Sequence, residues 1–366
     1  MNILYVANLG TNRASGVNVV VPQHMKHQAK HANIGFYNLQ RISMPIDTNV
    51  HVLDGNEYPE FDLSKFPVPF NLPDLVVFHD IFSSLTFCKI AKELQKKSIP
   101  YIVVPHGCFT HSAIKRRKIK KVVALHTIYK TLVYKSDAIQ YLTEDERKNS
   151  YVKHNSIIVP NGTFIPEKLE LDKDKPKNIS FVYIGRKDIH IKGIDVLLEA
   201  FSLAANVMRA SGSTLTLYGP DRKGSFMEID KIISKYKIDD FVCNKDGVFD
   251  EEKEKVLKNS TVFVQTSRTE GHPIGLIEAC AHGLPVLVTP GTSISKEVQG
   301  FNCGWVASLS GESIANQIVH IINNKAEIPK RSRNAINYVS KLYNWDIVAK
   351  SAINQYKSVI ENYHKK

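Results

Sequence analysis

Short apolar runs alternate with amphipathic segments along the entire 366-residue chain. This alternation favours parallel β-sheets with helices on both faces, because each parallel strand needs a crossover connection, which is most often a helix. We expect nine strands, at Ile3–Ala7, Leu75–His79, Tyr101–Pro105, Ala138–Tyr141, Ser156–Val159, Ile179–Ile184, Thr214–Tyr218, Val262–Thr266 and Pro285–Val288. They fall into two sets, and the sequence therefore predicts an α/β protein with two doubly wound domains.

The segment at residues 167–177 is too polar and too charged for a core, so it marks the predicted junction between the domains. We place the first Rossmann-like domain at residues 1–165 and the second at residues 166–345. Apolar residues recur at helical spacing within residues 346–366, which predicts a terminal helix. The composition, 43% hydrophobic and 23% charged, suits two globular domains with substantial cores.

The formal net charge of +12 predicts attraction to an anionic partner: a nucleic acid, a membrane surface or a phosphorylated substrate. The densest basic run, Lys115–Lys121, precedes apolar residues at helical spacing up to Val133, so we expect one amphipathic helix with a basic start. This start is either a solvated helix end or a docking site for anionic lipid head groups or a lipid-diphosphate acceptor. We expect no nucleic acid partner, because no helix-turn-helix, zinc-finger or RNP pattern accompanies the charge.

No apolar run approaches the roughly 18 residues that a membrane-spanning helix needs, and residues 1–6 form a strand without a charged leader or cleavage site. The sequence therefore predicts a cytoplasmic protein. The basic run leaves peripheral association with the inner face of the cell membrane open. The five cysteines are scattered, odd in number and without a CxxC pair, so we expect reduced, packed thiols.

Two glutamates, Glu270 and Glu278, bracket the segment EGHPIGLIE. Pro273 suits the first position of a helix, since its ring fixes φ and the N–H that it lacks would have had no partner. Gly283 followed by Leu-Pro is a helix stop. We therefore predict a helix from Pro273 to about His282, with Glu270 in the preceding loop. Glu278 would lie on its second turn and lean back toward the helix start, so that both carboxylates face one ligand.

The start of this helix is a predicted phosphate site. The N–H groups of Gly275, Leu276 and Ile277 are expected to be free there, and the positive end of the helix dipole lies beside them.

A second strand-to-helix junction supplies two cations. Arg186 follows the strand that ends at residue 184, and Lys192 precedes the helix that begins at residue 194. A cation at a helix N-terminus is unfavourable by about 0.3–1 kcal/mol, because it faces the positive end of the helix dipole. The position of Lys192 therefore favours an anionic ligand between its ammonium group and the helix start. Both side chains would meet it in the crevice where open α/β sheets bind ligands. Together with the helix start, they could neutralise a departing diphosphate without a metal.

In the spacing of these four charged residues, the second half of the chain resembles the GT-B fold glycosyltransferases of family 4, the retaining glycosyltransferases group 1. The resemblance implies that Arg186 and Lys192 bind the diphosphate of the donor. It also implies that Glu270 contacts hydroxyls of the transferred sugar and that Glu278 holds the ribose. His272 departs from the pattern, because family members often carry an aromatic or aliphatic residue there.

Shorter motifs extend the resemblance over nearly the whole chain. Gly16, in Ser-Gly-Val after the first strand, resembles the family's N-terminal glycine loop, which approaches the phosphates and the acceptor. His106, in Pro-His-Gly, resembles the motif histidine beside the reacting sugar, where it would hydrogen-bond the sugar and steady charge. The family's GT-B fold sets two Rossmann-like domains across a cleft. The first domain binds the acceptor, the second binds the nucleotide-sugar donor, and the terminal helix, here 346–366, returns to the first.

These features predict a retaining, metal-independent hexosyltransferase without a cofactor. It would move a sugar from a UDP- or GDP-sugar to the hydroxyl of a sugar or lipid-linked acceptor, and the basic charge favours bacterial cell-surface polysaccharide or glycolipid assembly. Glu270 is either a covalent nucleophile or a hydrogen-bonding residue. A nucleotide-sugar 2-epimerase and a non-catalytic nucleotide-sugar-binding subunit remain alternatives. A nicotinamide-dependent oxidoreductase is disfavoured, because the loop after the first strand lacks GxGxxG.

A group of three histidines and a single further histidine have competing interpretations. His24, His27 and His31 would share one helix face, and without a neighbouring carboxylate or cysteine a solvated face is favoured over a metal site. His79, with Asp80, ends another strand of the first domain, where a cleft-lining role and a structural role are equally consistent with the sequence.

Overall fold

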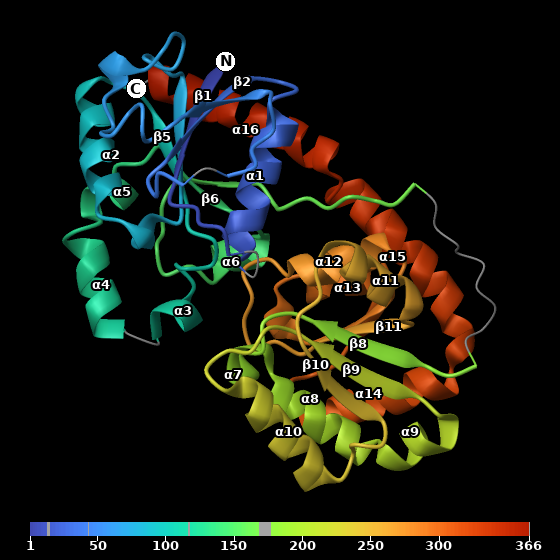
Figure 1. Ribbon diagram of the computed structural model, residues 1–366. Coiled ribbons are helices and arrows are strands. Elements are labelled where there is room, and N and C mark those ends of the chain that lie inside the picture. Colours follow the sequence, from blue (N-terminus) through green and yellow to red (C-terminus); the bar gives the residue numbers. More distant parts are fainter. Residues whose placement is uncertain (13–14, 43, 116–117, 168–176, 366) are drawn as a thin grey trace. The chain divides into compact units, whose positions relative to one another are not determined.

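The computed structural model describes residues 1–12, 15–42, 44–115, 118–167 and 177–365. The chain divides into two compact units (Figure 1). Unit 1 comprises Met1–Gly162 and Trp345–Lys366, and unit 2 comprises Thr163–Asn344. The sequence places the corresponding limits after residues 165 and 345. Most of the polar segment that we interpret as the domain junction, residues 168–176, lies outside the described residues.

Unit 1 contains a seven-stranded sheet in the order β3-β2-β1-β4-β5-β6-β7, with parallel pairing throughout. Its strands are β1 (Asn2–Ala7), β2 (Asn33–Asn38), β3 (Val50–Leu53), β4 (Leu75–His79), β5 (Tyr101–Val104), β6 (Ala138–Tyr141) and β7 (Ser156–Ile158). The strand order reverses between β1 and β4. Ligands of open α/β sheets bind at the carboxyl ends of the strands beside such a switch point.

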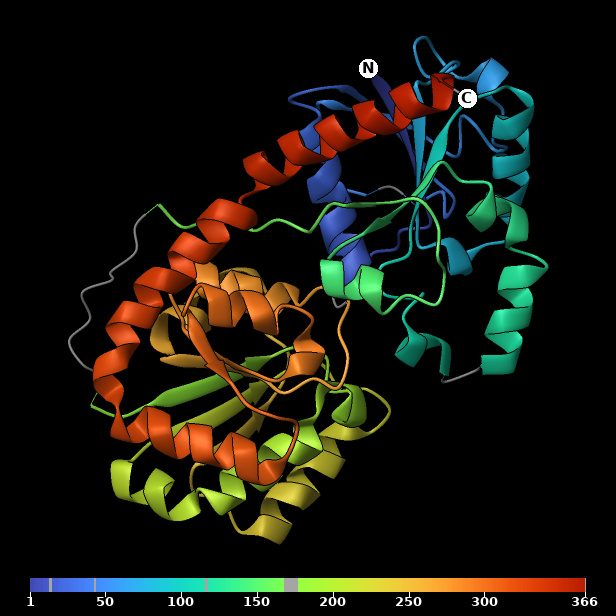
Figure 2. The ribbon, with the colours of Figure 1, turned by 180° about the vertical axis from the view of Figure 1, so that it is seen from behind.

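Helices cover both faces of this sheet (Figures 1 and 2). On one face α1 packs against α16, and on the other α2 packs against α5. The helical elements of unit 1 are α1 (Gly16–Gln28), η1 (Leu63–Lys65), η2 (Ile81–Ser83), α2 (Thr86–Lys96), α3 (His111–Lys115), α4 (Lys118–His126), α5 (Lys130–Tyr134), α6 (Glu144–Lys148) and α16 (Trp345–His364).

The terminal helix α16 is held on unit 1 by its apolar face and by two polar contacts. Trp345, Val348 and Tyr356 are buried. The Tyr356 hydroxyl donates to Gln140 Oε1 on β6 at 2.7 Å, and the Gln355 amide exchanges two hydrogen bonds with the backbone of Ile158 at the end of β7. The apolar spacing read from residues 346–366 therefore does form a helix that packs on the first unit.

Unit 2 contains a six-stranded parallel sheet in the order β10-β9-β8-β11-β12-β13. Its strands are β8 (Ser180–Ile184), β9 (Thr214–Tyr218), β10 (Val242–Lys245), β11 (Val262–Gln265), β12 (Val286–Val288) and β13 (Gly304–Val306). The switch point of this sheet lies between β8 and β11.

The helices of unit 2 also cover both faces of its sheet (Figure 1). They are α7 (Ile189–Lys192), α8 (Ile194–Leu203), α9 (Ala205–Ser211), α10 (Ser225–Tyr236), α11 (Asp250–Asn259), α12 (Ile274–Ala281), η3 (Pro290–Thr292), α13 (Ser295–Gly300), α14 (Gly311–Asn323), η4 (Lys325–Glu327) and α15 (Ile328–Leu342). The largest core cluster of unit 2 lies between the sheet and α8, α10 and α14, and a second lies under α12, α13 and α15. Among the described residues, none of the helices combines the length and apolar character that crossing a membrane requires.

The predicted α/β architecture is confirmed, and each of the nine predicted strands is present within one residue at either end. Four further strands, β2, β3, β10 and β13, were not predicted. Three of these lie at sheet edges and are short or polar, so they lack the continuous apolar run of a buried strand. The fourth, β2, contains Gly35, which reads as a strand breaker. A Cβ on Gly35 would lie 2.7 Å from the Phe70 ring, so the glycine makes room for that side chain.

The prediction of one long amphipathic helix after the basic run is wrong. In the described residues α4 ends at His126 and α5 begins at Lys130, with a turn between them. Leu125 and Leu132 are buried, whereas Val123 and Ile128 are more than half exposed. Of the basic run, Arg116 and Arg117 lie outside the described residues, whereas Lys115 ends α3 and Lys118 begins α4.

The expectation of a solvated histidine face on α1 is also wrong for two of the three residues. His24 and His27 are buried against Trp345 of α16, with ring centroids 5.0 and 5.4 Å apart, and only His31 is exposed. The predicted shared helix face holds only for His24 and His27, because α1 ends at Gln28 and His31 lies in the turn that follows. The two buried rings pack against a helix more than 300 residues away in sequence.

Candidate functional site

The four charged residues predicted for the donor site all lie in unit 2, on or beside the loops at the carboxyl edge of its sheet. The loop after β8 carries Arg186 and leads to Lys192, while the loop after β11 carries Glu270 and leads to Glu278 on α12. These two strands flank the switch point, where loops diverge to opposite faces of the sheet and leave room for a ligand.

Lys192 is the last residue of α7, a short helix that was not predicted. Asp188 caps its start by accepting from the N–H of Ile191 at 3.0 Å. Gly193 then separates α7 from α8. The carbonyl end of a helix stabilises a cation. The position of Lys192 between the two helices therefore does not by itself require an anion beside it.

Gly193 joins the two loops of the site through a very close backbone contact. Its φ is +65°, and a Cβ at this position would lie 2.0 Å from the carbonyl oxygen of Thr266 at the end of β11. The Thr266 hydroxyl donates to the Gly193 carbonyl at 3.0 Å. Only glycine combines this backbone conformation with this approach.

Arg268 reinforces the same junction. Its backbone N–H donates to the Ile191 carbonyl at 2.8 Å, and its guanidinium forms a two-bonded pair with Asp195, at 2.7 Å for both bonds. The segment around Lys192 is thus held against the loop that carries Glu270 by backbone and side-chain bonds.

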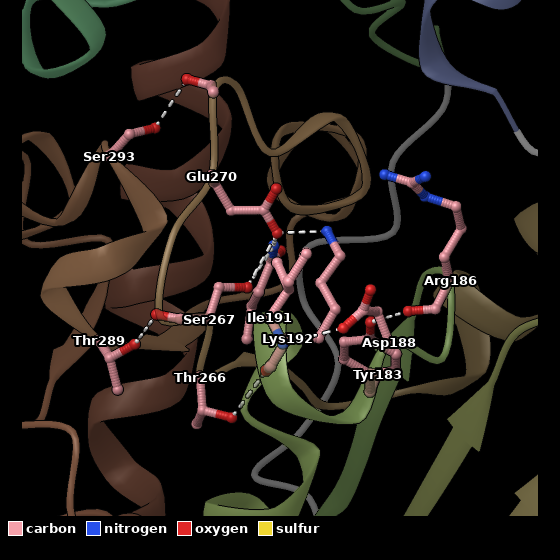
Figure 3. A network of polar contacts seen from close by, with 12 residues as sticks. Tyr183, Arg186, Asp188, Ile191, Lys192, Thr266, Ser267, Glu270, Thr289 and Ser293 are labelled. Atoms are coloured by element: carbon pink, nitrogen blue, oxygen red, sulfur yellow. Dashed lines mark hydrogen bonds and ion pairs between the residues drawn. The ribbon is translucent and has the colours of Figure 1, made fainter. Parts of the chain in front are cut away.

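Glu270 receives three donors on one carboxylate oxygen (Figure 3). Lys192 Nζ forms an ion pair with Oε1, and the Gln265 amide and Ser267 hydroxyl donate to the same oxygen at 2.7 and 2.8 Å. The lysine and glutamate side chains are only 13% and 12% exposed. Among the described residues no hydrogen bond involves Oε2, so that oxygen is available to a ligand.

Arg186 is exposed, and its guanidinium has no hydrogen-bond partner among the described residues. Figure 3 shows the side chain extended away from the loop, while its backbone carbonyl accepts from the Tyr183 hydroxyl at 3.0 Å. The structure therefore fixes the backbone of Arg186 and leaves its charge free to meet an anion.

The helix that carries Glu278 begins one residue later than predicted, at Ile274, with Pro273 as its N-cap. The premise of three free donors is wrong. The N–H groups of Leu276 and Ile277 both donate to the Pro273 carbonyl, at 3.0 and 3.2 Å. What this helix start offers an anion is mainly the positive end of its dipole. Gly275 also allows close packing, because a Cβ there would lie 3.0 Å from the Ile184 carbonyl at the end of β8.

Glu278 forms an ion pair with Lys253 of α11, at 2.8 Å. Both side chains are about a quarter exposed. The pair orients the Glu278 carboxylate from a third element of the unit. His272, the departure from the family pattern, is buried with its ring against Tyr343, at a centroid distance of 5.1 Å.

The other two predicted site residues, Gly16 and His106, lie in unit 1. Gly16 is the exposed first residue of α1, after the N-cap Ser15. His106 follows β5 and takes a left-handed backbone conformation, with φ of +48°, and Gly107 follows with φ of +82°. A non-glycine residue in this region is strained, and such strain is concentrated at functional sites.

The His106 turn is held by two groups from neighbouring elements. The Glu146 carboxylate is buried and accepts from the N–H of Gly107 at 2.6 Å and from that of Leu142 at 2.8 Å. Burial raises the pKa of Glu146 to about 7 in spite of these two donors. His79 contacts His106 directly, with 2.9 Å between His79 Nδ1 and His106 Nε2. Burial lowers the pKa of His106 to about 3 and that of His79 well below its usual value.

Several residues of these sites were not identified from the sequence. Lys253, Gln265 and Ser267 gave no signal, because an ion pair or hydrogen bond between elements depends on how they pack. Glu146 is different, because Thr143 and Glu146 have the sequence spacing of a capping box, which marks a helix start. In the structure the Thr143 hydroxyl accepts from the Glu146 N–H at 3.0 Å.

Comparisons with known proteins identify the family and the fold that this chain is similar to. Residues 163–341 match the family model of the glycosyl transferases group 1. Protein CapJ of Staphylococcus aureus is 26% identical over 207 residues, which cover 54% of this chain and 50% of CapJ. The chain spans about half the length of the curated relatives it matches.

Solved structures match over nearly the full chain. The sucrose-phosphate synthase of Thermosynechococcus elongatus superposes with a TM-score of 0.70 and 18% identity, covering 99% of both chains. Anabaena HepE in complex with UDP superposes with a TM-score of 0.72 and 14% identity, covering 98% of this chain and 100% of HepE. At these identities the likeness establishes the fold, which is the GT-B fold.

Proposed function

Residues 163–341 belong to the glycosyl transferases group 1, and from this premise we propose that the chain is a retaining glycosyltransferase that uses a nucleoside diphosphate sugar. The observation that carries the proposal is the carboxyl edge of the second sheet. There an exposed arginine, Arg186, and a lysine paired with a glutamate, Lys192 and Glu270, lie on or beside the loops that flank the switch point. This is where open α/β sheets bind nucleotides.

Arg186 and Lys192 would neutralise the diphosphate as the bond to the sugar breaks. Charge develops on the leaving phosphate in this step, and preorganised cations stabilise it most effectively where water is scarce. Lys192 is largely buried and is held by the α7–α8 junction, so little reorganisation is needed. The dipole of α12 adds to this field, while the N–H groups of Leu276 and Ile277 are bonded to the Pro273 carbonyl.

Glu270 would bind hydroxyls of the transferred sugar through Oε2. Its other oxygen already holds Lys192, Gln265 and Ser267, which fix the direction of the carboxylate. Because Lys192 is one of these donors, sugar and diphosphate recognition are coupled through one ion pair. Glu278 would hold the ribose, with Lys253 keeping its carboxylate in place.

Retention would follow from a front-face route, in which the leaving phosphate accepts the proton of the acceptor hydroxyl. A covalent route through Glu270 is the other possibility. We favour the front-face route, because one oxygen of Glu270 already accepts from three donors. These donors partly neutralise the carboxylate and make it a weaker nucleophile. The acceptor would bind to unit 1, where Gly16 and His106 lie.

The acceptor would be a sugar or lipid-linked hydroxyl on the cytoplasmic side of a membrane, and unit 1 offers one observation in support. Leu85 and Ile128 are 56% and 54% exposed, and Cys88, three residues after Leu85, bonds the Ile128 carbonyl. Lys89 is exposed on the same helix, α2. Exposed apolar side chains beside an exposed lysine favour an anionic lipid surface. Sedimentation with vesicles of anionic lipid, compared with neutral lipid, tests this.

The test of the proposed function is an assay of purified protein with UDP-, GDP- and ADP-sugars, with and without candidate acceptors. We expect release of the nucleoside diphosphate and an α or β product of the same anomeric configuration as the donor, with activity retained in excess EDTA. Conversion of a UDP-sugar without acceptor would identify an epimerase. Nucleotide binding without any turnover would identify a non-catalytic subunit.

A further inference from the structure

Two histidines of unit 1 form a direct contact between neighbouring strand ends. His79 is the last residue of β4, and His106 follows β5, the next strand in the sheet. His79 Nδ1 lies 2.9 Å from His106 Nε2. The His79 ring is fully buried and stacks on the Tyr5 ring of β1, at a centroid distance of 5.2 Å and an interplanar angle of 13°. Its orientation is therefore fixed by packing.

For this contact to be a hydrogen bond, one of the two nitrogens must carry a proton and donate, and the other must be unprotonated and accept the hydrogen bond. If His106 Nε2 were the donor, the proton of neutral His79 would be on His79 Nε2. That atom is buried and has no hydrogen-bond partner among the described residues. A buried N–H without an acceptor is rarer in folded proteins than a buried acceptor without a donor. The proton of His79 therefore belongs on Nδ1, where it donates to His106.

The backbone of the turn fixes the position of the second ring. His106 is in the left-handed region, and the next N–H, of Gly107, is bonded to the buried Glu146 carboxylate at 2.6 Å. With the turn held by Glu146 and Nε2 held by His79, the remaining ring nitrogen, Nδ1, has a defined direction. Because Nε2 accepts, neutral His106 must carry its own proton on Nδ1.

We propose that His79 is a positioning residue that commits His106 to the tautomer with its proton on Nδ1, which makes His106 a neutral hydrogen-bond donor to a sugar oxygen. It is then neither a general base nor a cation in the reaction. The inference rests on the proposed function only for the identity of the ligand, a sugar hydroxyl or ring oxygen. The tautomer itself is a property of the protein alone.

The direct test is ¹⁵N NMR of the histidine side chains in the full chain. We expect the resonances of His106 to show a protonated Nδ1 and an unprotonated Nε2 in the wild type and in His79→Asn. The Asn amide can place an N–H donor where His79 Nδ1 lies. In His79→Leu the donor is lost, and the preference for Nδ1–H should disappear.

Kinetics separate this role from a purely structural one. We expect His79→Leu to lower kcat about 10- to 100-fold, with the KM for the donor changed less than threefold, and His79→Asn to restore kcat to within about threefold of the wild type. His31→Asn, an exposed histidine of the same unit, is the matched control and should leave both parameters unchanged.

A wild-type spectrum with the proton of His106 on Nε2 would overturn the proposal, as would equal loss of kcat in the Asn and Leu variants. If His79→Leu does not fold, the wild-type spectrum and the Asn variant still decide the matter. If the wild type transfers no sugar, the proposed function fails, whereas the tautomer can still be read from the free protein.

Discussion

At the scale of single residues, the ion pair between Lys192 and Glu270 is the most constrained feature of the candidate donor site. Both side chains are largely withdrawn from water, so each is costly without the other. Gln265 and Ser267 bind the same carboxylate oxygen and limit how far it can move. The pair therefore acts as one unit, and a change in either partner should affect both stability and donor use.

Lys192→Met tests this unit. We expect the variant to lower kcat/KM for the donor by about 100-fold or more, because a preorganised charge facing the diphosphate is lost. It should also lower the free energy of unfolding by about 1–3 kcal/mol, since Glu270 keeps only neutral donors. Steady-state kinetics and urea unfolding measure the two effects. Lys231→Met, at an exposed lysine of α10, should change neither, and equal behaviour of the two variants would contradict the assignment.

The sequence identified the charged residues that could face a ligand but not the residues that hold them. Arg186, Lys192, Glu270 and Glu278 follow strand ends or helix starts, where ligand-binding side chains are expected. Lys253, by contrast, reaches Glu278 from another helix, and no local pattern predicts a contact that depends on tertiary packing.

At the scale of elements, the junction between α7 and α8 determines where Lys192 lies. Gly193 combines a left-handed backbone with contact to the end of β11. We expect Gly193→Ala to be destabilising by roughly 2–4 kcal/mol, from strain at positive φ and from displacement of the Thr266 carbonyl. Thermal unfolding gives the stability change, and the same variant should bind the donor more weakly because Lys192 moves.

Two other glycines separate these contributions. Gly224 also has positive φ, +81°, but a Cβ there would have open space, so Gly224→Ala should cost only about 1 kcal/mol. Gly300→Ala, with neither constraint, should be close to neutral. If Gly193→Ala is no more destabilising than Gly224→Ala, the close contact between Gly193 and Thr266 does not determine the stability of this junction.

Most elements of both sheets could be predicted because their strands are buried on both faces and are therefore continuously apolar. The edge strands β3, β10 and β13 could not, since one side of each faces solvent or loops and the apolar pattern is broken. The short helix α7 was not predicted either. Its four residues are too few for a periodic pattern, and its start depends on the Asp188 cap.

At the scale of the whole molecule, the chain returns to unit 1 at Trp345, beside two buried histidines. The His24 ring nitrogen Nε2 lies 3.2 Å from Asn161 Oδ1, and both His24 and His27 contact the Trp345 ring. Burial lowers the pKa of His24 to about 4; the hydrogen bond with Asn161 opposes this shift, and the charge of His27 contributes to it. The packing of α16 on α1 is therefore coupled to pH.

The sign of this coupling follows from the lowered pKa. His24 binds its proton near pH 6.5 in the unfolded chain and near pH 4 in the folded protein. Its contribution to the free energy of unfolding is therefore fully present above pH 6.5 and is lost as the pH falls to about 4. The loss is up to about 3 kcal/mol for this one group. We expect His24→Gln to reduce the fall in Tm across that range, measured by calorimetry. His31→Gln should leave this decrease in Tm unchanged. If His24→Gln shows the same decrease in Tm as the wild type, the packing of α16 on α1 is not coupled to pH through His24.

The central claim is that a nucleoside diphosphate binds at the carboxyl edge of the second sheet, against Arg186 and Lys192. Isothermal titration calorimetry of UDP, GDP and ADP with the wild type and with the Arg186→Ala/Lys192→Ala double variant tests it most directly. We predict that at least one of the three binds the wild type with one site per chain, and that the double variant weakens this binding by about 100-fold or more. Equal affinity for both proteins, or no binding of any of the three to the wild type, would contradict the account.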